Sequence, residues 1–427
     1  MKTLRLIALL ACITGFAPPS HSYSVLTHEQ IIDLAWPDQI RPLLLKRFPQ
    51  ATADDIKQAH AYAYAGSVVQ DMGYYPFGNK YFSDLLHYVR TGDFINALIA
   101  ESSNLTEYAF ALGALAHYSS DNVGHPAINK VVAIEFPKLQ RKYGDEVTYA
   151  DDHKAHIRTE FGFDMVQVAK NRYTSDRFHD FIGFEVSKPV LERAFLKTYG
   201  LQLHDVLGDE DLAIGSFRRA VSRIIPAMTR VALLNRRADL VRDTPNFDEK
   251  KFLYRVSRTN YEKQWGRGYR RPGIGSRILA FILRSIPKIG PASALAFKVP
   301  TAKTEDIYIK SVNQTSDNYY SLLHQVRDDS PIFPDTDCDT GRKTAPAEYA
   351  LADVTYARLL QDLTKNNFAQ MTPELRSNVL EFYSNLSAPY HNKKNHKSWE
   401  RTMQALEKLK NWHPSPVQNQ PVPVGSN

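Results

Sequence analysis

The sequence is poor in cysteine and has no long apolar run. Its 427 residues include two cysteines, Cys12 and Cys338, and Cys12 lies in a segment that we expect to be removed. Cys338 alone cannot form an intrachain disulfide, even in the oxidising compartment that an exported protein meets. No segment after residue 22 reaches the roughly 18 uninterrupted apolar residues that a membrane-spanning helix needs. Something other than disulfides must therefore stabilise the fold.

Charge of one sign is not in large excess either. The 53 Lys and Arg against 46 Asp and Glu give a formal net charge of +7, and removal of the first 22 residues, with one Lys and one Arg, lowers it to +5. This excess is too small to indicate nucleic-acid binding by itself. Basic residues do gather after about residue 235, above all in 255–277, RVSRTNYEKQWGRGYRRPGIGSR.

The first 22 residues have the pattern of a signal peptide. A short positive segment precedes an apolar run at 6–17, and Ser20 and Ser22 place small residues where a signal peptidase cleaves. We therefore expect cleavage after Ser22 and a soluble, exported protein that is secreted or periplasmic. The alternative is a lipoprotein signal ending at Cys12, which would give a different N-terminus.

Helical periodicity dominates the rest of the chain. In 26–36, LTHEQIIDLAW, Thr27 is a candidate N-cap with Gln30 three residues later as its capping-box partner. Further helices are expected over 53–70, 80–91, 105–121 and 151–170, with breaks at Gly73, Gly78, Gly124-His125-Pro126 and Tyr143-Gly144. The pattern predicts an all-α, multi-helix bundle.

Histidines and carboxylates recur on these helices at metal-ligand spacing. His117 and Asp121 are four residues apart, as are His156 and Glu160, so each pair leaves one face of its helix. A single pair of this kind is more often an ordinary surface contact. The interleaved series is harder to explain in that way, because buried histidines need partners. The sequence therefore predicts a polynuclear metal site among His28, Asp71, His87, His117, Asp121, His125, His156 and Glu160.

The ordered series YSVLTH, GSVVQD, DLLHY, HYSSDNVGHP and HIRTE resembles the superfamily of zinc-dependent phospholipase C and the single-strand-specific nucleases. The resemblance implies a helical bundle that encloses three zinc ions. It implies that Tyr23, through its free amine and its carbonyl, and His28 hold one zinc with Asp121, which bridges to a second zinc. The expected ligands of the other two ions are Asp71, His87 and His117 for the second, and His125, His156 and Glu160 for the third.

The sequence departs from the usual pattern of this superfamily in two places. Tyr23 stands where several relatives have Trp, which matters little because the ligands are backbone atoms. His125 follows Asp121 by four residues rather than six, which bears on the third site. His153 is a rival to His156, and His60 and Asp84 are candidates for orienting the ligands.

Paired zinc ions would lower the pKa of a shared water and so supply a hydroxide nucleophile for phosphate-ester hydrolysis. We expect a zinc-dependent phosphodiesterase, a phospholipase C that cleaves the glycerol-phosphate bond of a phospholipid, with Asp71 and Asp121 as catalytic residues. Asp71 is a ligand or, alternatively, a general base. Other hypotheses are a zinc-dependent single-strand nuclease and a non-catalytic lipid-binding protein that zinc stabilises.

Aromatic residues crowd the segment between Asp71 and His87. They could enclose a choline headgroup by cation–π attraction, stack on a base, or simply pack in the core. The candidate substrate-binding residues are Tyr74, Tyr75, Phe77, Tyr81 and Phe82.

The C-terminal part has a different character. Residues 278–286 are apolar and flanked by Arg277, Arg284 and Lys288, a pattern of a helix lying in an anionic membrane interface or of a buried hairpin. We expect a phospholipid or membrane surface as partner, with nucleic acid less favoured and the oligomeric state open. The predicted organisation is a signal peptide at 1–22, the zinc domain at 23–235, a basic, mainly helical extension at 236–412 and a Pro-rich disordered tail at 413–427.

Overall fold

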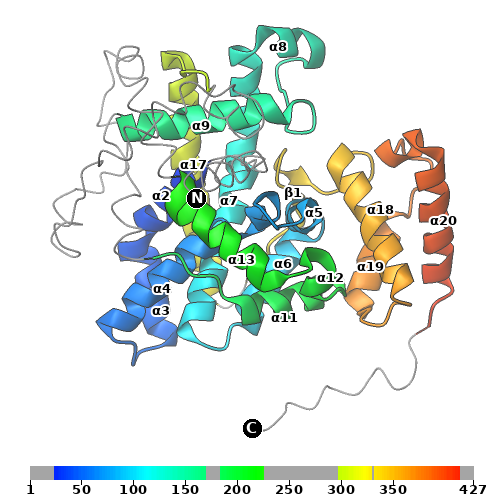
Figure 1. Cartoon of the computed structure of the whole chain (residues 1–427), viewed down its shortest axis with the longest axis horizontal. Helices are drawn as coiled ribbons and strands as arrows, with labels where there is room; N and C mark the ends of the chain where they lie inside the picture. The colour runs from blue at the N-terminus through cyan, green and yellow to red at the C-terminus, as the bar shows by residue number, and fades with distance from the viewer. Residues whose placement is uncertain (1–23, 170–182, 226–296, 329–330, 414–427) are drawn as a thin grey trace, which may run out of the picture. The chain divides into compact units, whose positions relative to one another are not determined.

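The computed structural model describes residues 24–169, 183–225, 297–328 and 331–413 (Figure 1). These residues are mainly helical, and strands are limited within them to one short antiparallel pair, which confirms the predicted all-α class. The elements are α2 (Val25–Ala35), η1 (Trp36–Ile40), α3 (Arg41–Arg47), α4 (Ala53–Gly66), η2 (Val69–Tyr74), α5 (Lys80–Tyr88), α6 (Thr91–Glu101), α7 (Leu105–Glu135), α8 (Pro137–Tyr143), α9 (His153–Ala169), α11 (Lys188–Tyr199), α12 (Leu203–Leu207), α13 (Glu210–Arg219), η3 (Ala220–Ile224), α17 (Ala302–Arg327), β1 (Thr336–Asp337), β2 (Arg342–Lys343), α18 (Ala350–Lys365), α19 (Pro373–Phe382), η6 (His391–Lys394) and α20 (His396–Lys410).

The chain divides into two compact units. Unit 1 comprises residues 1–198 and 202–344, and unit 2 comprises residues 199–201 and 345–427. The signal peptide, Tyr23, the boundary expected near residue 235, the apolar stretch 278–286 and the tail after residue 413 lie outside the described residues. Unit 1 continues to residue 344, so α17 and the β1–β2 pair belong with the bundle. No helix among the described segments is long and apolar enough to cross a membrane.

In unit 1, α4, α6 and α17 lie around the long helix α7 (Figure 1). Helices α4 and α7 cross very closely because each has a glycine at the contact. A Cβ on Gly113 would lie 2.2 Å from the Ala63 carbonyl oxygen, and one on Gly66 would lie 2.1 Å from the Phe110 carbonyl oxygen. This crossing brings the next turn of α7, which carries His117, against the end of α4.

Helix α7 does not end at Gly124-His125-Pro126, and this prediction was wrong. A proline inside a helix costs about 3 kcal/mol through its missing N–H and ring clash. The turns beyond Pro126 bury Ile128, Val131 and Val132 completely. Each such side chain contributes roughly 1.5–3 kcal/mol on burial, so packing outweighs the local cost.

Helix α2 begins at Val25, with Ser24 at its N-cap, earlier than the N-cap predicted at Thr27. Thr27 lies in the first turn because its hydroxyl has a tertiary partner, donating to Asp164 Oδ1 at 2.9 Å. The amide of Leu26 donates to Asp164 Oδ2 at 3.2 Å. The start of α2 is thus held to α9, far from it in sequence.

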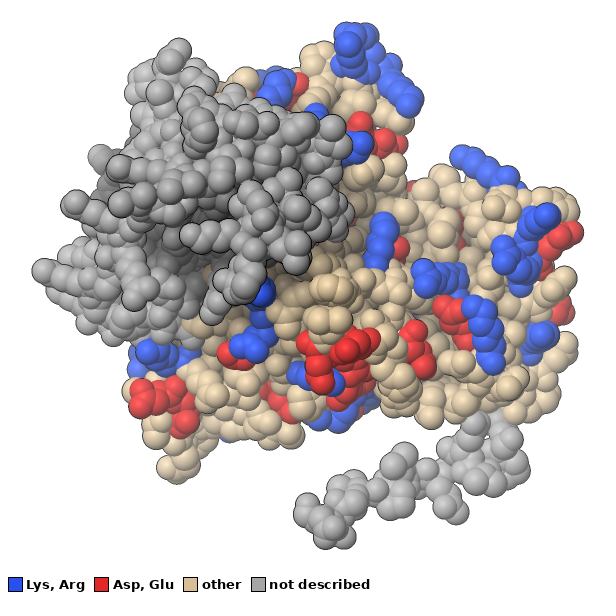
Figure 2. All heavy atoms as spheres, in the orientation of Figure 1, with Lys and Arg blue, Asp and Glu red and all other residues tan. Residues whose placement is uncertain are grey.

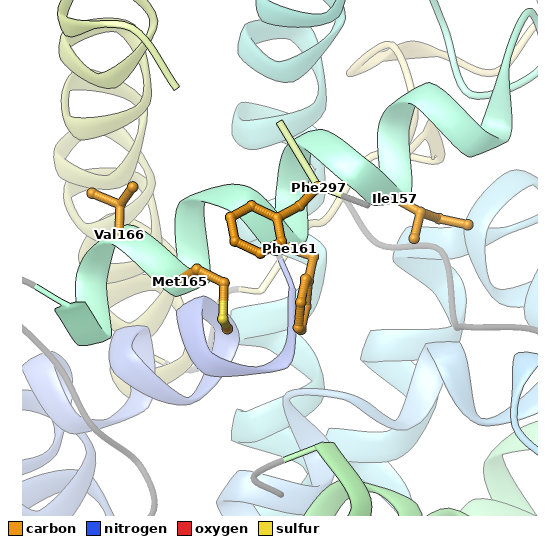
Figure 3. Close-up of a cluster of buried hydrophobic side chains, with 5 residues drawn as sticks. All are labelled: Ile157, Phe161, Met165, Val166 and Phe297. Carbon is orange, nitrogen blue, oxygen red and sulfur yellow. The ribbon is translucent and has the colours of Figure 1, made fainter. Parts of the chain in front are cut away.

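Helix α9 has an apolar stripe beside a polar one. Ile157, Phe161 and Met165 recur every four residues and pack with Val166 and Phe297 in a buried cluster (Figure 3). The adjacent stripe, one residue earlier at each step, is His156, Glu160 and Asp164, and all three are also buried. The apolar stripe anchors α9, and the polar stripe is available for a site in the interior.

Unit 2 is built from α18, α19 and α20 around an aromatic core. The rings of Tyr356 and Phe382 stack with centroids 3.7 Å apart, and the ring centroid of Tyr390 lies 5.3 Å from that of Trp399. Buried Asp353 accepts a hydrogen bond from the backbone amide of His391 at 2.7 Å. The mainly helical character expected for the C-terminal extension holds in these described residues.

Acidic and basic side chains are interspersed on the described surface that Figure 2 shows. Pairs such as Lys188 with Asp211, 2.8 Å apart, and Lys197 with Glu101, 2.7 Å apart, place opposite charges side by side. On this face the described part of the chain therefore presents no broad region of one sign.

Candidate metal centre

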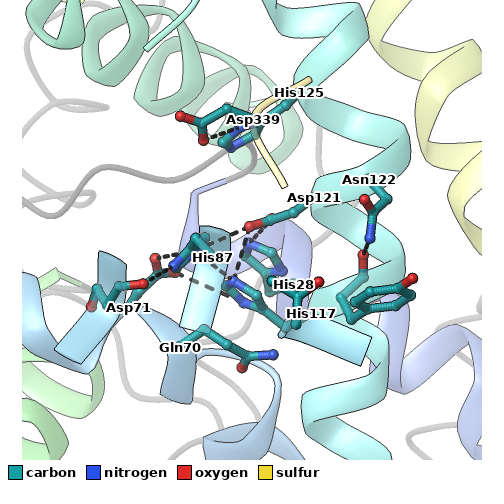
Figure 4. Close-up of polar contacts among 12 residues, drawn as sticks. His28, Gln70, Asp71, His87, His117, Asp121, Asn122, His125 and Asp339 are labelled. Carbon is teal, nitrogen blue, oxygen red and sulfur yellow. Dashed lines mark hydrogen bonds and ion pairs between the residues drawn. The ribbon is translucent and has the colours of Figure 1, made fainter. Parts of the chain in front are cut away.

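Four elements of unit 1 bring the predicted ligands together inside the bundle. His28 comes from α2, Asp71 from η2, His87 from α5, and both His117 and Asp121 from α7 (Figure 4). All five side chains are buried. Ligand atoms of His28, His117 and Asp121 lie within 4.8 Å of one another, as do those of Asp71, His87 and His117. The structure thus assembles two adjoining groups that could each hold a metal ion.

The Asp121 carboxylate lies between the two groups. Its Oδ1 is 3.7 Å from His28 Nε2. Its Oδ2 is 3.0 Å from His117 Nε2 and 3.2 Å from His87 Nε2. A carboxylate that turns one oxygen to each of two imidazole groups can bridge two cations.

Backbone carbonyls fix the protonation of two histidine rings. His87 Nδ1 donates to the Ser83 carbonyl at 2.7 Å, and His117 Nδ1 donates to the Ser67 carbonyl at 2.9 Å. A carbonyl can only accept, so in each neutral ring Nε2 carries a lone pair. These two Nε2 atoms are 3.2 Å apart. Either a proton or a metal ion can satisfy two buried nitrogen atoms at this distance, and a ligating histidine in proteins commonly donates its other N–H to a carbonyl. The donor set fits zinc.

The electrostatics of the cluster also favour a cation. Burial alone would lower the pKa of His87, but the carboxylates of Asp121 and Asp71 outweigh it and raise that pKa well above its usual value. The pKa of His117 is raised by the same balance. Burial opposes ionisation of Asp121, yet the neighbouring histidines hold its pKa well below the usual range. Asp121 is therefore an anion in the protein interior, and nearby positive charge is needed to offset the cost of burying it.

The residues predicted for the third ion form two pairs rather than one compact group. His156 Nδ1 lies 3.4 Å from Glu160 Oε1, and its Nε2 donates to the Val147 carbonyl at 2.6 Å. His125 lies 6.4 Å from His156, measured between ring centroids. Burial lowers the pKa of His156, so its ring is neutral and Nδ1 carries the lone pair. This is again the arrangement of a metal ligand.

One acidic residue at this place was missed by the sequence analysis. Asp339 Oδ1 lies 2.8 Å from His125 Nδ1, although 214 residues separate them in the chain (Figure 4). The run Asp335-Thr-Asp-Cys-Asp-Thr-Gly341 offered a signal, since alternating acids ending in glycine are unusual in a helical chain. No spacing rule connected that run to the histidines.

Comparison with known families decides the assignment of this part of the chain. Residues 27–208 match the family model described as zinc dependent phospholipase C. This segment belongs to the zinc-dependent phospholipase C family. Neither the curated proteins nor the solved structures contain a match. The segment is accordingly that of a zinc-dependent hydrolase, and the expected reaction class is phosphodiester hydrolysis.

Other residues considered at the sequence level for the metal centre are exposed or have other partners. His153 is exposed, whereas His156 is buried. His60 Nε2 lies 3.0 Å from Asp33 Oδ1, and its ring stacks on Trp36. Asp84 forms an ion pair with Lys80. These contacts account for His60 and Asp84 without a metal.

The predicted substrate-binding aromatics occupy three kinds of environment. Tyr75, Tyr81 and Phe82 are buried, and the Phe82 ring stacks on Phe195 with centroids 5.7 Å apart. Tyr74 is half-buried and its ring centroid lies 6.1 Å from that of His87. Phe77 is 63% exposed. The sequence also allowed these aromatic residues simply to pack in the core. The buried rings of Tyr75, Tyr81 and Phe82 fit that alternative.

Proposed function

We propose that this protein is a phospholipase C that hydrolyses the glycerol-phosphate bond of a phospholipid at a lipid surface. The observation that carries the proposal is the position of Asp121 between His28 on one side and His87 and His117 on the other, within the segment that matches the family. Zinc ions bound there would supply a hydroxide nucleophile near neutral pH and positive charge for the phosphoryl oxygens.

The residues of this chain have definite tasks in that proposal. Asp121 joins the two ligand groups and keeps its negative charge. The carbonyls of Ser83 and Ser67 hold the rings of His87 and His117 with Nε2 toward the site. Asp71, with Oδ1 3.4 Å from His87 Nε2, is a ligand or a general base. These contacts pre-organise the site, so little rearrangement is needed when a charged substrate binds.

The N-terminal amine is part of the same proposal. Cleavage after Ser22 would leave Tyr23 as the first residue, and we propose that its amine and carbonyl complete the ligands beside His28. The contacts of Asp164 with Leu26 and Thr27 support this, because they fix the beginning of α2 inside the bundle. We also propose that the protein is exported, because a free amine at Tyr23 depends on removal of the first 22 residues as a signal peptide.

Phe77 supports action at a lipid surface. Its side chain is mostly exposed and its backbone has φ +62°, a conformation that L residues rarely adopt. Tyr74, three residues earlier, reaches the neighbourhood of His87. A strained backbone that presents a phenyl ring to solvent suits insertion into an acyl layer close to the metals.

The proposal is tested with protein that begins at Tyr23, loaded with zinc and mixed with liposomes of several headgroups. Mass spectrometry should detect diacylglycerol, and the lipid that disappears should identify the headgroup. An Asp121→Asn variant should lose the activity, while Asp335→Asn, a change of another carboxylate in the same unit, should retain it. If every lipid survives although zinc is bound, the phospholipase C proposal fails, and cleavage of single-stranded nucleic acid is then assayed with the same protein.

A further inference from the structure

The segment 335–343 reaches the candidate metal centre from far along the chain and is firmly held there. The backbone amide of Cys338 donates to the carbonyl of His87 at 3.0 Å. The amide of Thr336 donates to the Thr91 hydroxyl at 2.9 Å, and the same hydroxyl donates to the Thr336 carbonyl at 2.9 Å. Asn129 Nδ2 donates to the Asp339 carbonyl at 2.9 Å. These bonds tie the segment to the ends and sides of α5, α6 and α7.

A proline and a glycine allow this segment to approach α7 closely. Pro126 has no N–H, so the Asn122 carbonyl one turn earlier lacks its helical donor. Gly341, with φ +69°, comes against that carbonyl, and a Cβ there would lie 2.4 Å from the Asn122 oxygen. The approach sets Asp339 beside His125, one residue before the proline.

The Asp339 side chain is buried between two groups. Its Oδ2 accepts a hydrogen bond from the Tyr88 hydroxyl at 2.9 Å, and its Oδ1 is 2.8 Å from His125 Nδ1. An ionised carboxylate in the interior is costly unless charge compensates it. The tyrosine donor is neutral, and a metal ion on the side of His125 would supply positive charge to this carboxylate.

That side contains nitrogen atoms suited to a metal. His125 Nδ1 and His156 Nδ1 are buried and form no hydrogen bond with the residues that the structure describes. Each lies near a carboxylate oxygen, His125 Nδ1 at 2.8 Å from Asp339 Oδ1 and His156 Nδ1 at 3.4 Å from Glu160 Oε1. Glu160 lies next to His156, and the charge of Asp339 acts on His156 as well. Two pairs, His125 with Asp339 and His156 with Glu160, therefore come from α7, α9 and the segment 335–343, and the two histidine rings lie 6.4 Å apart between centroids.

We propose that Asp339 is a ligand of the third metal ion, together with His125, His156 and Glu160. The inference rests on zinc binding as given under the proposed function, and it adds a residue outside the matched segment 27–208. Two carboxylates balance the charge of a divalent ion in a buried site, whereas Glu160 alone leaves one positive charge uncompensated. A carboxylate oxygen, two imidazole nitrogens and a second carboxylate give the four protein ligands of a closed zinc site.

Metal content tests the proposal directly. Protein is loaded with zinc, freed of excess metal by gel filtration and analysed by inductively coupled plasma mass spectrometry. Wild type should hold three ions per chain, and Asp339→Asn should hold two. Asp335→Asn, the matched control in the same segment, should hold three. With Co²⁺ in place of zinc, the visible absorption should lose the contribution of one site in Asp339→Asn only.

A second variant separates ligation from a role in orienting His125. Asn keeps a hydrogen-bond acceptor, so an orienting residue would tolerate the change, whereas a ligand would not. Asp339→His supplies a nitrogen ligand and should restore the third ion. Three ions and an unchanged Co²⁺ spectrum in Asp339→Asn would overturn the proposal, and so would a wild type with two ions. Because the readout is metal content, failure of the lipid assay leaves this result interpretable.

Discussion

The Nε2 atoms of His87 and His117 face each other across 3.2 Å in the interior of unit 1. Both atoms carry lone pairs in the neutral rings, since each Nδ1–H is committed to a backbone carbonyl. In the metal-free protein a proton can lie between them, because the carboxylates of Asp121 and Asp71 outweigh burial and raise the pKa of both rings. A bound zinc ion would replace that proton and use both lone pairs.

Zinc should therefore stabilise the protein strongly. At free zinc about 1,000 times the dissociation constant, binding to the folded state contributes about 4 kcal/mol, which corresponds to a rise of roughly 10 °C in Tm for a unit of this size. Differential scanning calorimetry of chelator-treated protein before and after zinc addition measures it. Mg²⁺, which prefers oxygen ligands, serves as the control. Equal melting temperatures with and without zinc would contradict the assignment of the donor set.

The close crossing of α4 and α7 should affect zinc binding at the candidate metal centre, because it sets the position of His117. Gly113→Ala places a Cβ 2.2 Å from the Ala63 carbonyl oxygen, so the helices must separate. We expect a loss of about 1–3 kcal/mol in the free energy of unfolding, as for overpacked cores, together with weaker zinc binding because His117 moves from the Ser67 carbonyl. Urea unfolding and a zinc titration measure the two effects.

Gly215→Ala is the matched control for that change. Gly215 lies within α13, and a Cβ added there has no atom of another element within 4 Å. Alanine should stabilise this helix by roughly 0.5–1 kcal/mol and leave zinc affinity unchanged. A loss of stability at Gly215 as large as that at Gly113 would mean that helix crossing is not the cause.

Local helix geometry accounts for what the sequence could predict of this site. The four-residue spacings of His117 with Asp121 and of His156 with Glu160 place each pair on one face of a helix, and the structure has both pairs in the interior. Asp339 could not be found in this way, because its position depends on how the segment 335–343 packs against α7. The helix end predicted at Pro126 was wrong for a related reason, since tertiary burial of the following turns outweighs the local cost of the proline.

Phe77 provides a test of surface action that is independent of the metal ligands. Phe77→Gly removes the exposed ring and suits the backbone at φ +62°, so the free energy of unfolding should rise by about 1 kcal/mol. Hydrolysis of liposomal phospholipid should fall several-fold through a higher apparent KM, while a short-chain monomeric phospholipid is cleaved at the wild-type rate. Equal losses on both substrates would show that Phe77 acts in the site rather than at the lipid surface.

Asp335 should make stability depend on pH. Burial and the neighbouring Asp93 raise its pKa to about 6, above the ordinary value of 3.8. Between these values the unfolded chain has released the proton and the folded chain retains it. The free energy of unfolding therefore falls as the pH rises from about 4 to above 6, by about 2–3 kcal/mol, since one pKa unit corresponds to about 1.4 kcal/mol.

Asp335→Asn should remove this dependence and leave the fold intact. The amides of Gly92 and Asp93 both donate to Oδ1, at 3.0 and 3.1 Å, and an asparagine oxygen can accept both bonds. Urea unfolding of wild type and variant at pH 4, 5, 6 and 7 measures the slope. The variant should be the more stable above pH 6, and parallel profiles for the two proteins would refute the role given to Asp335.

The segment 335–343 binds to α5, α6 and α7, so the interior of unit 1 depends on residues that are synthesised well after the helices that carry the histidines. His28 and Asp339 are 311 residues apart, and closing so long a loop delays the contacts that depend on it. A chain that has emerged only as far as residue 330 still lacks Asp339 and the backbone amide that binds the His87 carbonyl. Completion of the buried cluster therefore waits until the segment 335–343 has been synthesised, long after the helices that carry the histidines.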